Sequence, residues 1–588
     1  MARKKNTECD NFTPSKYQKQ IFDFIQNEKG NLLIEAVAGS GKTTTIVKAL
    51  NLIPDDKSVL FCAFNKDIVK DLTKKTKGLK NIEVRTIHGL GYIICIENLP
   101  TISRKIDVNK YFQEFITNFY KYTKNSQTHL GYQKWVKFRK NVCKLIDLSR
   151  LNLVTQPQEI TTIANYYGID LIGDEENTVV KLMEWGKINT KSMDYTDMVW
   201  YPNIFDFDLS RASFDYIFVD EAQDLSKAQR EFILKCNNNS TRYAFVGDGN
   251  QSIYGFSAAD PESFNEIKKI NDITILPLSV CYRCPKEIVN FANALVPEIE
   301  AADDAIRGTI EAHSQLDNIE DQDMILCRYN APLLSAYTKL ISKGKKTYIM
   351  GKDIGSNLID IIQSTQHSNL YLDLTQKGVF SALYKDYFNK RNQLIKSNGW
   401  TAEMADSSPL LLSMQDNIFA LEVVAQGVST TAQLIDKISK IFSDDGSEGI
   451  KLSTIHKAKG LESNNVYIID SDSFKRDESK MTNWEKQQEK NLKYVAYTRP
   501  KKKLGFIKDN DICNVKPNQF HNGHGESITN YLNKIEKIID ELYSSKTNPI
   551  RLNTAIGSNG KTLGHTPRRT HNQPLKFGIL GANKRKKI

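Results

Sequence analysis

The sequence lacks the features that mark membrane, secreted and disulfide-bonded proteins. It contains no run of 18 or more apolar residues, so we expect no membrane-spanning helix and no membrane partner. The basic first residues lead into the polar segment Asn6–Asp10, which argues against a secretory signal peptide. The nine cysteines are scattered and indicate no disulfide framework. We therefore expect a cytoplasmic protein, in the host cytoplasm if the high Asn, Lys and Ile usage reflects a phage genome.

Most of the chain also has little net charge. The 588 residues carry a formal charge of +11, but residues 551–588 hold nine Lys or Arg and no acidic residue. That leaves +2 for the first 550 residues, so their charge does not by itself indicate a polyanionic partner. The basic tail has two interpretations, a tether to nucleic-acid phosphates or a solubilising end.

Short apolar runs, each followed by a turn and a helical pattern, predict an α/β fold. Examples are Leu32–Ala36, Val59–Ala63, Tyr216–Val219, Tyr243–Val246, Met324–Leu326 and Val466–Ile469. Strands that alternate with helices form parallel sheets, and these runs fall into two clusters. We therefore predict two parallel-sheet lobes, each with a mostly helical insertion.

The same pattern predicts the domain boundaries. The first lobe would comprise residues 1–95 and 206–278, with its insertion at 96–205. The second lobe would comprise residues 279–355 and 447–519, with its insertion at 356–446. A C-terminal helix and a flexible basic tail would follow over residues 520–588.

A glycine-containing loop follows the first apolar run. It comprises Ala36, Val37, Ala38, Gly39, Ser40, Gly41, Lys42 and Thr43, and a helix opens at Thr44. Such a loop wraps phosphates because glycines let backbone N–H groups turn inward, and the helix N-terminus adds positive potential. Lys42 would neutralise the β- and γ-phosphates of ATP, and Thr43 would hold Mg²⁺. A similar string at 557–562 has no apolar strand before it, so we interpret it as accidental.

A second apolar strand, Phe214–Val219, ends abruptly in acidic residues. Asp220 would reach the Mg²⁺ shell, and Glu221 would position and polarise the attacking water. The alternative is a solvated acidic turn. The direct passage from a buried strand into carboxylates favours the catalytic interpretation.

Four further segments complete an ordered set of motifs. They are Val246–Phe256, Tyr282–Arg283, Thr454–Glu462 and Leu492–Arg499. With the two sites above, they make the chain resemble superfamily 1 helicases of the UvrD/Rep type over about residues 12–505. The resemblance implies two RecA-like lobes that use ATP and Mg²⁺ and act on single-stranded DNA and on junctions with duplex DNA. It also implies a monomer or weak oligomer that serves DNA repair or replication.

For the nucleotide, the resemblance assigns three residues to the base and sugar. Gln18 would read the adenine, and Tyr282 would stack on its ring. Glu462 would lie near the ribose.

Three other residues would act on the γ-phosphate. The resemblance implies that Gln251 senses this phosphate and couples it to DNA, and that Arg283 and Arg499 reach it from the second lobe. An arginine in that place stabilises the charge that develops on the transferred phosphoryl group. Hydrolysis would then depend on closure of the two lobes.

For the nucleic acid, the resemblance points to nine residues, Phe64, Asn65, Lys66, Thr86, His88, Tyr254, Phe256, Thr454 and His456. Aromatic rings hold unstacked bases of any sequence, and hydroxyl, amide and lysine groups hold the backbone. Two of these residues also have a plain structural interpretation, Phe64 as core and His88 as a turn histidine.

The motifs of the chain depart from the common family pattern at two places. Cys62–Lys66 shifts the usual aromatic by one position, and Phe256–Ala258 keeps a ring but lacks the usual arginine. The shifted version is closer to the F-box helicase branch. Cys281 and Cys284 have CxxC spacing but no second pair nearby, so we expect no structural metal there.

These observations predict an ATP-dependent DNA helicase that translocates on single-stranded DNA, by resemblance in the 3′–5′ direction. One alternative is a translocase that displaces proteins from DNA without unwinding it. A second is a non-motor DNA-binding scaffold with a degenerate ATP site, and a third is an RNA motor. The sequence does not indicate a protein partner.

Overall fold

The computed structural model describes residues 12–79, 81–119, 129–167, 169–238, 240–253, 260, 262–365, 376–406, 408–442, 448–470, 481, 483–508 and 511–512. All of them belong to one compact unit that comprises residues 1–528. The predicted C-terminal helix and basic tail lie outside the described residues. No helix among the described residues is long and apolar enough to cross a membrane.

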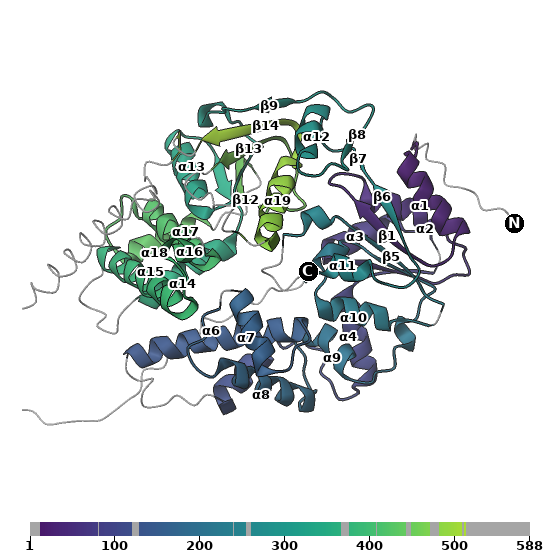
Figure 1. Cartoon of the computed structure of the whole chain (residues 1–588), viewed down its shortest axis with the longest axis horizontal. Coiled ribbons are helices and arrows are strands. Elements are labelled where there is room, and N and C mark those ends of the chain that lie inside the picture. Colours follow the sequence, from purple (N-terminus) through teal and green to yellow (C-terminus); the bar gives the residue numbers. More distant parts are fainter. Residues whose placement is uncertain are drawn as a thin grey trace, which may run out of the picture. The chain divides into compact units, whose positions relative to one another are not determined.

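The first sheet consists of six parallel strands in the order β3-β2-β4-β5-β1-β6 (Figure 1). Their bounds are β1 Asn31–Ala36, β2 Val59–Ala63, β3 Ile82–Thr86, β4 Tyr216–Val219, β5 Arg242–Gly247 and β6 Ile273–Leu278. β1 lies between β5 and β6, and Leu32 pairs with Ala244 and Thr274. All residues of β2 and β4 are buried, as expected for central strands with helices on both faces.

Successive side chains of β1 point to opposite faces of this sheet, and each face has its own core. Leu32 and Ile34 pack with residues of α1 (Lys16–Asn27), α2 (Lys42–Leu50) and α3 (Lys66–Lys75). Leu33 packs with residues of α4 (Ile87–Asn98), α10 (Lys227–Lys235) and α11 (Ser263–Ile267). The predicted site residues of this lobe that follow β1, β2, β4 and β5 lie at the carboxyl ends of these strands.

The first insertion is helical. It comprises α5 (Lys110–Glu114), a π-helical turn at Phe115–Phe119, α6 (His129–Leu151), α7 (Pro157–Tyr166), α8 (Glu175–Ile188) and α9 (Asp197–Ile204). A buried ionic network joins three of these elements. The fully buried Arg150 of α6 donates to Asp194 and Asp197 at 2.7–2.9 Å, and the Lys110 ammonium of α5 lies 2.9 Å from Asp197. The network therefore fixes α5 and α6 to the start of α9.

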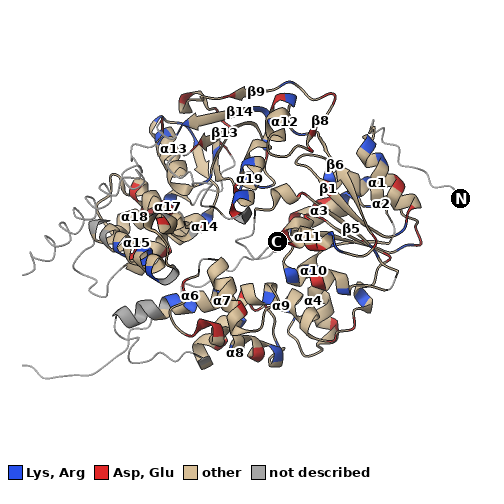
Figure 2. Cartoon of the chain, in the orientation of Figure 1, with Lys and Arg blue, Asp and Glu red and all other residues tan. Residues whose placement is uncertain are grey.

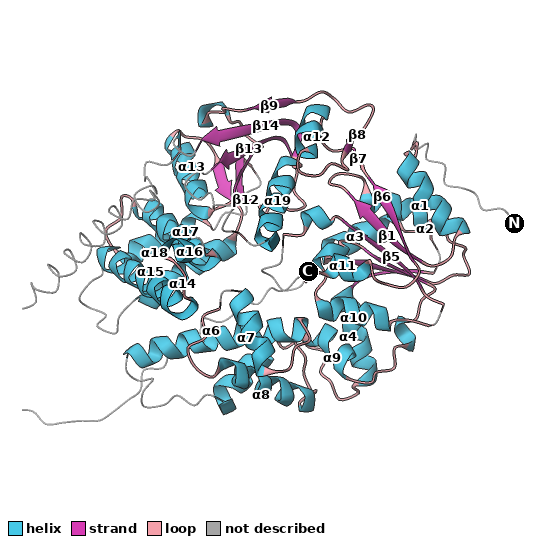
Figure 3. Ribbon diagram, viewed as in Figure 1, coloured by secondary structure: helices cyan, strands magenta, loops and turns pink. Residues whose placement is uncertain are grey.

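The second sheet also has six parallel strands, in the order β11-β12-β10-β13-β14-β9 (Figure 3). Their bounds are β9 Thr309–Glu311, β10 Met324–Cys327, β11 Thr347–Ile349, β12 Ile450–Thr454, β13 Ser463–Asp470 and β14 Pro500–Lys508. Helices α12 (Lys286–Asn293) and α19 (Asn483–Tyr497) bury their apolar residues against it. A short parallel pair, β7 (Val280–Cys281) and β8 (Glu300–Ala301), precedes this sheet in the chain.

The second insertion adds five more helices, α14 (Lys352–Thr365), α15 (Gln376–Asn398), α16 (Ala402–Asp406), α17 (Pro409–Ala425) and α18 (Thr431–Ile441). It is tied to the sheet through α13 (Asn330–Ser342), whose first N–H groups donate to the Asp416 carboxylate of α17 at 2.9 Å. Basic and acidic residues are interspersed over both lobes (Figure 2), in keeping with the low net charge of the body. The predicted α/β class, with two parallel sheets and helical insertions, is confirmed.

Candidate nucleotide and nucleic-acid sites

The phosphate loop lies between β1 and α2, where its glycines are required by the backbone. Gly39 and Gly41 have φ of 67° and 76°, in the left-handed region that favours glycine. A Cβ on Gly39 would also lie 2.6 Å from the Cβ of Arg283. The loop is therefore covered by the segment that carries Arg283, and a side chain at Gly39 would push that segment away.

The loop has an unsatisfied polar group of the kind that a phosphate would engage. The Ser40 hydroxyl is buried and has no hydrogen-bond partner among the described residues. The Ala38 N–H, in contrast, donates to the Tyr494 hydroxyl of α19 at 2.9 Å. The α2 helix begins at Lys42, two residues before the predicted start at Thr44, so Thr43 and Thr44 lie in its first turn. Its N-terminus carries partial positive charge. The residues present fit a bound phosphate chain.

Two acidic residues follow β4 and titrate in opposite directions. Burial and the charge of Glu221 raise the pKa of Asp220. Burial opposes the ionisation of Glu221 too, but Lys42 and Lys459 outweigh it and hold the pKa of Glu221 low. Glu221 is thus ionised at neutral pH, and its Oε1 lies 2.9 Å from Lys42 Nζ.

Lys42 keeps its positive charge in this acidic setting. Burial disfavours the ammonium, but Glu221, Asp220 and Asp248 together outweigh that cost and raise the pKa of Lys42. A cation and several carboxylates thus meet at the ends of β1, β4 and β5. This arrangement suits a divalent cation and a polyphosphate, since both would find opposite charges in place.

Gln223 connects these carboxylates, a role that the sequence analysis missed. Its Nε2 donates to Glu221 Oε2 at 2.5 Å and to Asp224 Oδ2 at 3.3 Å. Its Oε1 accepts from the Asp248 N–H at 3.0 Å. The only signal in the sequence was its place inside the acidic turn between Glu221 and Asp224.

The structure brings together Gln251 and Arg499, which come from different lobes. Arg499 is buried, and its guanidinium donates to Gln251 Oε1 at 3.1 Å and to the Leu461 carbonyl at 3.2 Å. Burial and the charge of Arg283 lower the pKa of Arg499 to about 10, so it remains charged at neutral pH. Gln251 Nε2 in turn donates to Asp248 Oδ2 at 2.6 Å. A second-lobe arginine is thus linked to the carboxylates of the first lobe.

Arg283 and Glu462 form a second pair beside the loop. Arg283 Nε donates to Glu462 Oε2 at 2.9 Å, and its Nη1 donates to the Thr498 carbonyl at 3.3 Å. Tyr282 donates its N–H to the Gly39 carbonyl at 2.9 Å, while 49% of the residue is exposed. An exposed ring next to the phosphate loop is available for stacking on a planar base.

The amide of Gln18 is already engaged within the first lobe. Its Oε1 accepts from the Ser15 N–H at 3.0 Å in a capping box, and its Nε2 donates to Thr45 Oγ1 at 2.9 Å. Gln18 is buried. It therefore ties α1 to α2, and contact with an adenine would require exchange of one of these bonds.

Three of the predicted nucleic-acid residues lie together after β2. Phe64 is 48% exposed, and Lys66 is exposed at the start of α3. Asn65 caps α3, accepting from the N–H groups of Asp67 and Ile68 at 2.9–3.0 Å. Its side-chain oxygen is thus already engaged. The exposure of Phe64 makes the plain core interpretation wrong for this residue.

Four more predicted residues lie at the ends of β3 and β12 or just after them, and they are less exposed. Thr86 caps α4 by accepting from the Gly89 N–H at 3.0 Å. Burial lowers the pKa of His88, so it is neutral at physiological pH. Burial, with the charge of Arg328, lowers the pKa of His456 well below its usual value, and Thr454 is buried. Tyr254 and Phe256, the last two of the nine, lie outside the described residues.

Further contacts join the two lobes beside the carboxylates. The Lys459 ammonium pairs with Asp224 and donates to the Gln251 carbonyl at 2.7 Å. Asn491 Nδ2 donates to the Ser252 carbonyl at 2.9 Å. The sequence analysis included Lys459 in a motif but assigned it no role.

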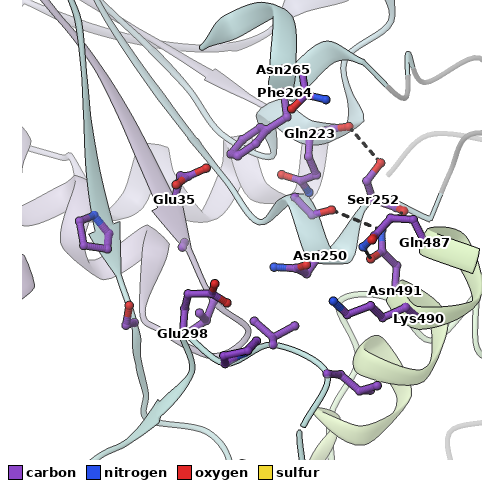
Figure 4. Close-up of a pocket in the computed structure, with 18 of the residues that line it drawn as sticks. Glu35, Gln223, Asn250, Ser252, Phe264, Asn265, Glu298, Gln487, Lys490 and Asn491 are labelled. Carbon is purple, nitrogen blue, oxygen red and sulfur yellow. Dashed lines mark hydrogen bonds between the residues drawn. The ribbon is translucent and has the colours of Figure 1, made fainter. Parts of the chain in front are cut away.

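A cavity of about 570 Å³ adjoins this junction. Figure 4 shows Glu35, Asn250 and Phe264 of the first lobe facing Lys490 and Asn491 of α19. The cavity is lined by Ala36 and Val37 at the start of the phosphate loop, but Lys42, Arg283 and Arg499 do not line it. The cavity therefore shares Ala36, Val37 and Gln223 with the candidate nucleotide site, but not the lysine or the two arginines.

Known proteins resemble the chain in the following way. Residues 17–271 match the UvrD/REP helicase N-terminal domain. F-box DNA helicase protein 1 of Schizosaccharomyces pombe is 25% identical over 549 residues, which are 83% of this chain and 56% of the relative. ATP-dependent DNA helicase PcrA of Bacillus subtilis is 23% identical over 300 residues, 46% of this chain and 38% of the relative. The Gabija protein GajB of Bacillus cereus is 27% identical over 329 residues, 50% of this chain and 63% of the relative.

The chain thus spans 56% or less of the length of the first two of these relatives. Among solved structures, an arterivirus nonstructural protein 10 helicase aligns with 81% of this chain and 59% of its own. The TM-score is 0.31 and the identity 11%.

Proposed function

We propose that this chain is a UvrD/Rep-type helicase of superfamily 1, an ATP-dependent motor that translocates on single-stranded DNA and unwinds duplex DNA. The match of residues 17–271 to the UvrD/REP helicase N-terminal domain and the similarity to DNA helicases support this proposal. The observation that carries the proposal is the link between the lobes at the candidate ATP site. Arg499 of the second lobe bonds to Gln251 of the first, which bonds to Asp248 beside Lys42. Such a site is complete only when both lobes contribute.

In this proposal Lys42 and the loop hold the β- and γ-phosphates of ATP, and Thr43 and Asp220 hold Mg²⁺. The bound Mg²⁺ would screen the charge of the phosphates. Glu221, which the structure gives as an ionised carboxylate, orients the attacking water and accepts its proton. Lys42, now paired with Glu221, gains a second anionic partner in the γ-phosphate.

Arginines of the second lobe make the reaction depend on lobe closure. Arg499 and Arg283 stabilise the charge that develops on the transferred phosphoryl group. Gln251 lies between Arg499 and the chain segment that leads to the predicted DNA residues Tyr254 and Phe256. In each cycle of closing and opening, one lobe moves along the single-stranded DNA while the other stays bound to it.

The proposed DNA track runs over the carboxyl ends of β2, β3 and β12. The exposed ring of Phe64 and the exposed Lys66 support it, because one stacks on bases and the other pairs with phosphates. Thr86, His88, Thr454 and His456 would provide neutral contacts to the strand. By family resemblance, we propose movement in the 3′–5′ direction, as a monomer or weak oligomer.

Three alternatives would give different results in the same assays. A translocase that displaces proteins without productive unwinding would hydrolyse ATP on single-stranded DNA but fail in strand separation. A non-motor scaffold would bind DNA without stimulated hydrolysis. An RNA motor would respond to RNA in place of DNA. We propose a cytoplasmic motor with the domain boundaries given by the sequence, acting in repair or replication.

ATP hydrolysis by the purified chain tests the proposal, with no nucleic acid, single-stranded DNA, duplex DNA or RNA. We expect single-stranded DNA to stimulate the rate strongly. Lys42→Ala and Glu221→Gln should each reduce the stimulated rate by roughly 10²-fold or more, the scale of losing one group that stabilises the transition state. Glu28→Gln, which changes an exposed glutamate at the end of α1, is the matched control and should retain activity.

The unwinding part of the proposal has its own assay. Duplexes with a 3′ or a 5′ single-stranded tail should be separated only when the tail is 3′. Hydrolysis that ignores DNA would contradict the motor, and stimulated hydrolysis without strand separation would favour the translocase.

A further inference from the structure

Two cysteines flank the residues that cover the phosphate loop. Cys281 is the last residue of β7, and Tyr282 and Arg283 separate it from Cys284. Pro285 then separates Cys284 from the start of α12. The Cys284 N–H donates to Cys281 Sγ at 3.4 Å. Cys281 Sγ lies 3.0 Å from the point that a Cβ on Gly39 would occupy, so this sulfur packs directly on the loop.

The surroundings of these cysteines suit thiol chemistry and not a metal. The described residues contain no group of three or more His, Cys, Asp or Glu that could hold a metal ion. The Cys284 thiol, a weak donor, donates to the Thr498 carbonyl at 3.5 Å. Two thiols three residues apart, with one amide already directed at the first sulfur, resemble the arrangement of reactive CxxC pairs in general.

The two thiols also differ in acidity. A hydrogen bond from Cys284 outweighs burial and lowers the pKa of Cys281 to about 7. The same bond and burial raise the pKa of Cys284. Burial raises the pKa of Cys236 to about 12 and also raises that of Cys62. Cys281 therefore has far more thiolate at neutral pH than these structural cysteines, and thiolate is the form that reacts.

We propose that Cys281 and Cys284 are a modification site, an oxidisable thiol pair that closes to a disulfide and disables the nucleotide site beside it. With hydrogen peroxide as the oxidant, the Cys281 thiolate attacks the O–O bond and becomes a sulfenic acid, and hydroxide leaves and takes up a proton to form water. The Cys284 thiol then attacks the Cys281 sulfur, and the sulfenic oxygen leaves as a second water. Two thiols lose two electrons and two protons, and one peroxide becomes two waters.

Closure of the disulfide breaks the contact of the Cys284 thiol with the Thr498 carbonyl, and we expect it to shift the turn that carries Tyr282 and Arg283. A disulfide brings the two sulfurs to about 2.05 Å, which the hydrogen-bonded thiols have not reached. The turn holds the Tyr282 N–H on the Gly39 carbonyl and Arg283 between Glu462 and Thr498. A shift of this turn moves the Tyr282 ring and Arg283 together, and so removes the segment that covers the phosphate loop at Gly39.

Both sulfurs are buried, so a small oxidant reaches them only when this turn opens. A nucleotide held under Tyr282 and Arg283 keeps the turn closed. Oxidation should therefore be slower when ATP is bound. This coupling rests on the proposed function of the site, whereas formation of the disulfide does not.

The experiment uses the full chain, treated with hydrogen peroxide and then alkylated. Mass spectrometry of the peptide that contains residues 281–284 should show loss of two hydrogens and no alkylation. Binding of a fluorescent ATP analogue and DNA-stimulated hydrolysis should both fall at least fivefold and recover on addition of dithiothreitol. A non-hydrolysable ATP analogue added before peroxide should slow the loss several-fold.

Two variants make the result specific. Cys284→Ser should retain activity when reduced. Excess peroxide should then inactivate it without recovery in dithiothreitol, because the Cys281 sulfenic acid, with no thiol to resolve it, is oxidised by a second peroxide to a sulfinic acid that dithiothreitol does not reduce. Cys143→Ser, which changes a cysteine of α6, should behave like the unaltered chain. Free thiols at 281 and 284 after peroxide treatment would overturn the proposal, as would a disulfide that leaves analogue binding unchanged. Absence of hydrolysis in the reduced chain would count against the motor alone, because the mass and the analogue binding are read separately.

Discussion

The pKa of each carboxylate after β4 and β5 depends on the groups around it. For Asp224, the shifted pKa should make the stability of the fold depend on pH. Burial raises its pKa to about 6, from 3.8, although Lys459 pairs with it. Between these values the folded protein binds more protons at this group than the unfolded chain. The contribution of Asp224 to stability therefore falls as pH rises through that window, by at most roughly 3 kcal/mol.

We predict that Asp224→Asn makes the unfolding free energy less dependent on pH between about 4 and 6. Urea unfolding of both proteins at several pH values in this window measures the effect. The slope is the quantity to compare, because loss of the Lys459 pair lowers stability at every pH. Equal slopes would mean that Asp224 is not protonated more readily in the folded state.

Residues with motif spacing could be predicted as site residues, whereas residues that act through a neighbour could not. Lys42 and Glu221 were predicted from the loop and from the end of an apolar strand, and the structure pairs them. Gln251 and Arg499 came from the family resemblance, and they are hydrogen-bonded. Gln223 was missed because an amide has no fixed role until the groups around it are known.

Among the elements, the first insertion depends on a buried charge. Arg150 of α6 is completely buried between Asp194 and Asp197, so its removal leaves Asp194 without the arginine that pairs with it and leaves Asp197 with Lys110 as its cation. We predict that Arg150→Leu destabilises the insertion by about 3–5 kcal/mol, the usual cost of breaking a buried ion pair. Limited proteolysis and urea unfolding should both show the loss. Lys140→Leu, on an exposed position of the same helix, is the control and should change stability little.

Central strands were easier to predict than edge strands. The runs Val59–Ala63 and Tyr216–Val219 coincide with β2 and β4, whose residues are all buried. β3 lies at the sheet edge and is only half-buried, with Glu83 and Arg85 in it, so no continuous apolar run marks it. Polar residues on an edge strand can face solvent, so the strand lacks the continuous apolar run by which a buried strand is predicted.

At the scale of the whole molecule, Lys459 joins the lobes at one point. It pairs with Asp224 and donates to the Gln251 carbonyl of the other lobe. We predict that Lys459→Met lowers the DNA-stimulated rate of ATP hydrolysis roughly tenfold or more, since a charged hydrogen bond contributes about 1.5–3 kcal/mol. Steady-state kinetics should show the loss mainly in kcat.

The matched control lies two residues away. Lys457 pairs with Asp353 on the surface, where ion pairs contribute little, so Lys457→Met should change the rate less than twofold. If Lys459→Met and Lys457→Met lowered the rate equally, Lys459 would contribute only its positive charge, and its specific contacts with Asp224 and Gln251 would not matter. The two-lobe plan could be predicted from the clusters of strands, but contacts between lobes could not, because they depend on side chains far apart in the sequence.

The position of β1 between β5 and β6 determines how late during translation the first sheet can form. β1 emerges early from the ribosome, but both of its neighbours, β5 and β6, are encoded more than 200 residues later. At about 5–20 residues per second, the strand that carries the phosphate loop waits roughly 10 to 50 s for its partners. Until then its apolar residues need protection from other chains. The first sheet can be completed only after Leu278, the last residue of β6, has been translated.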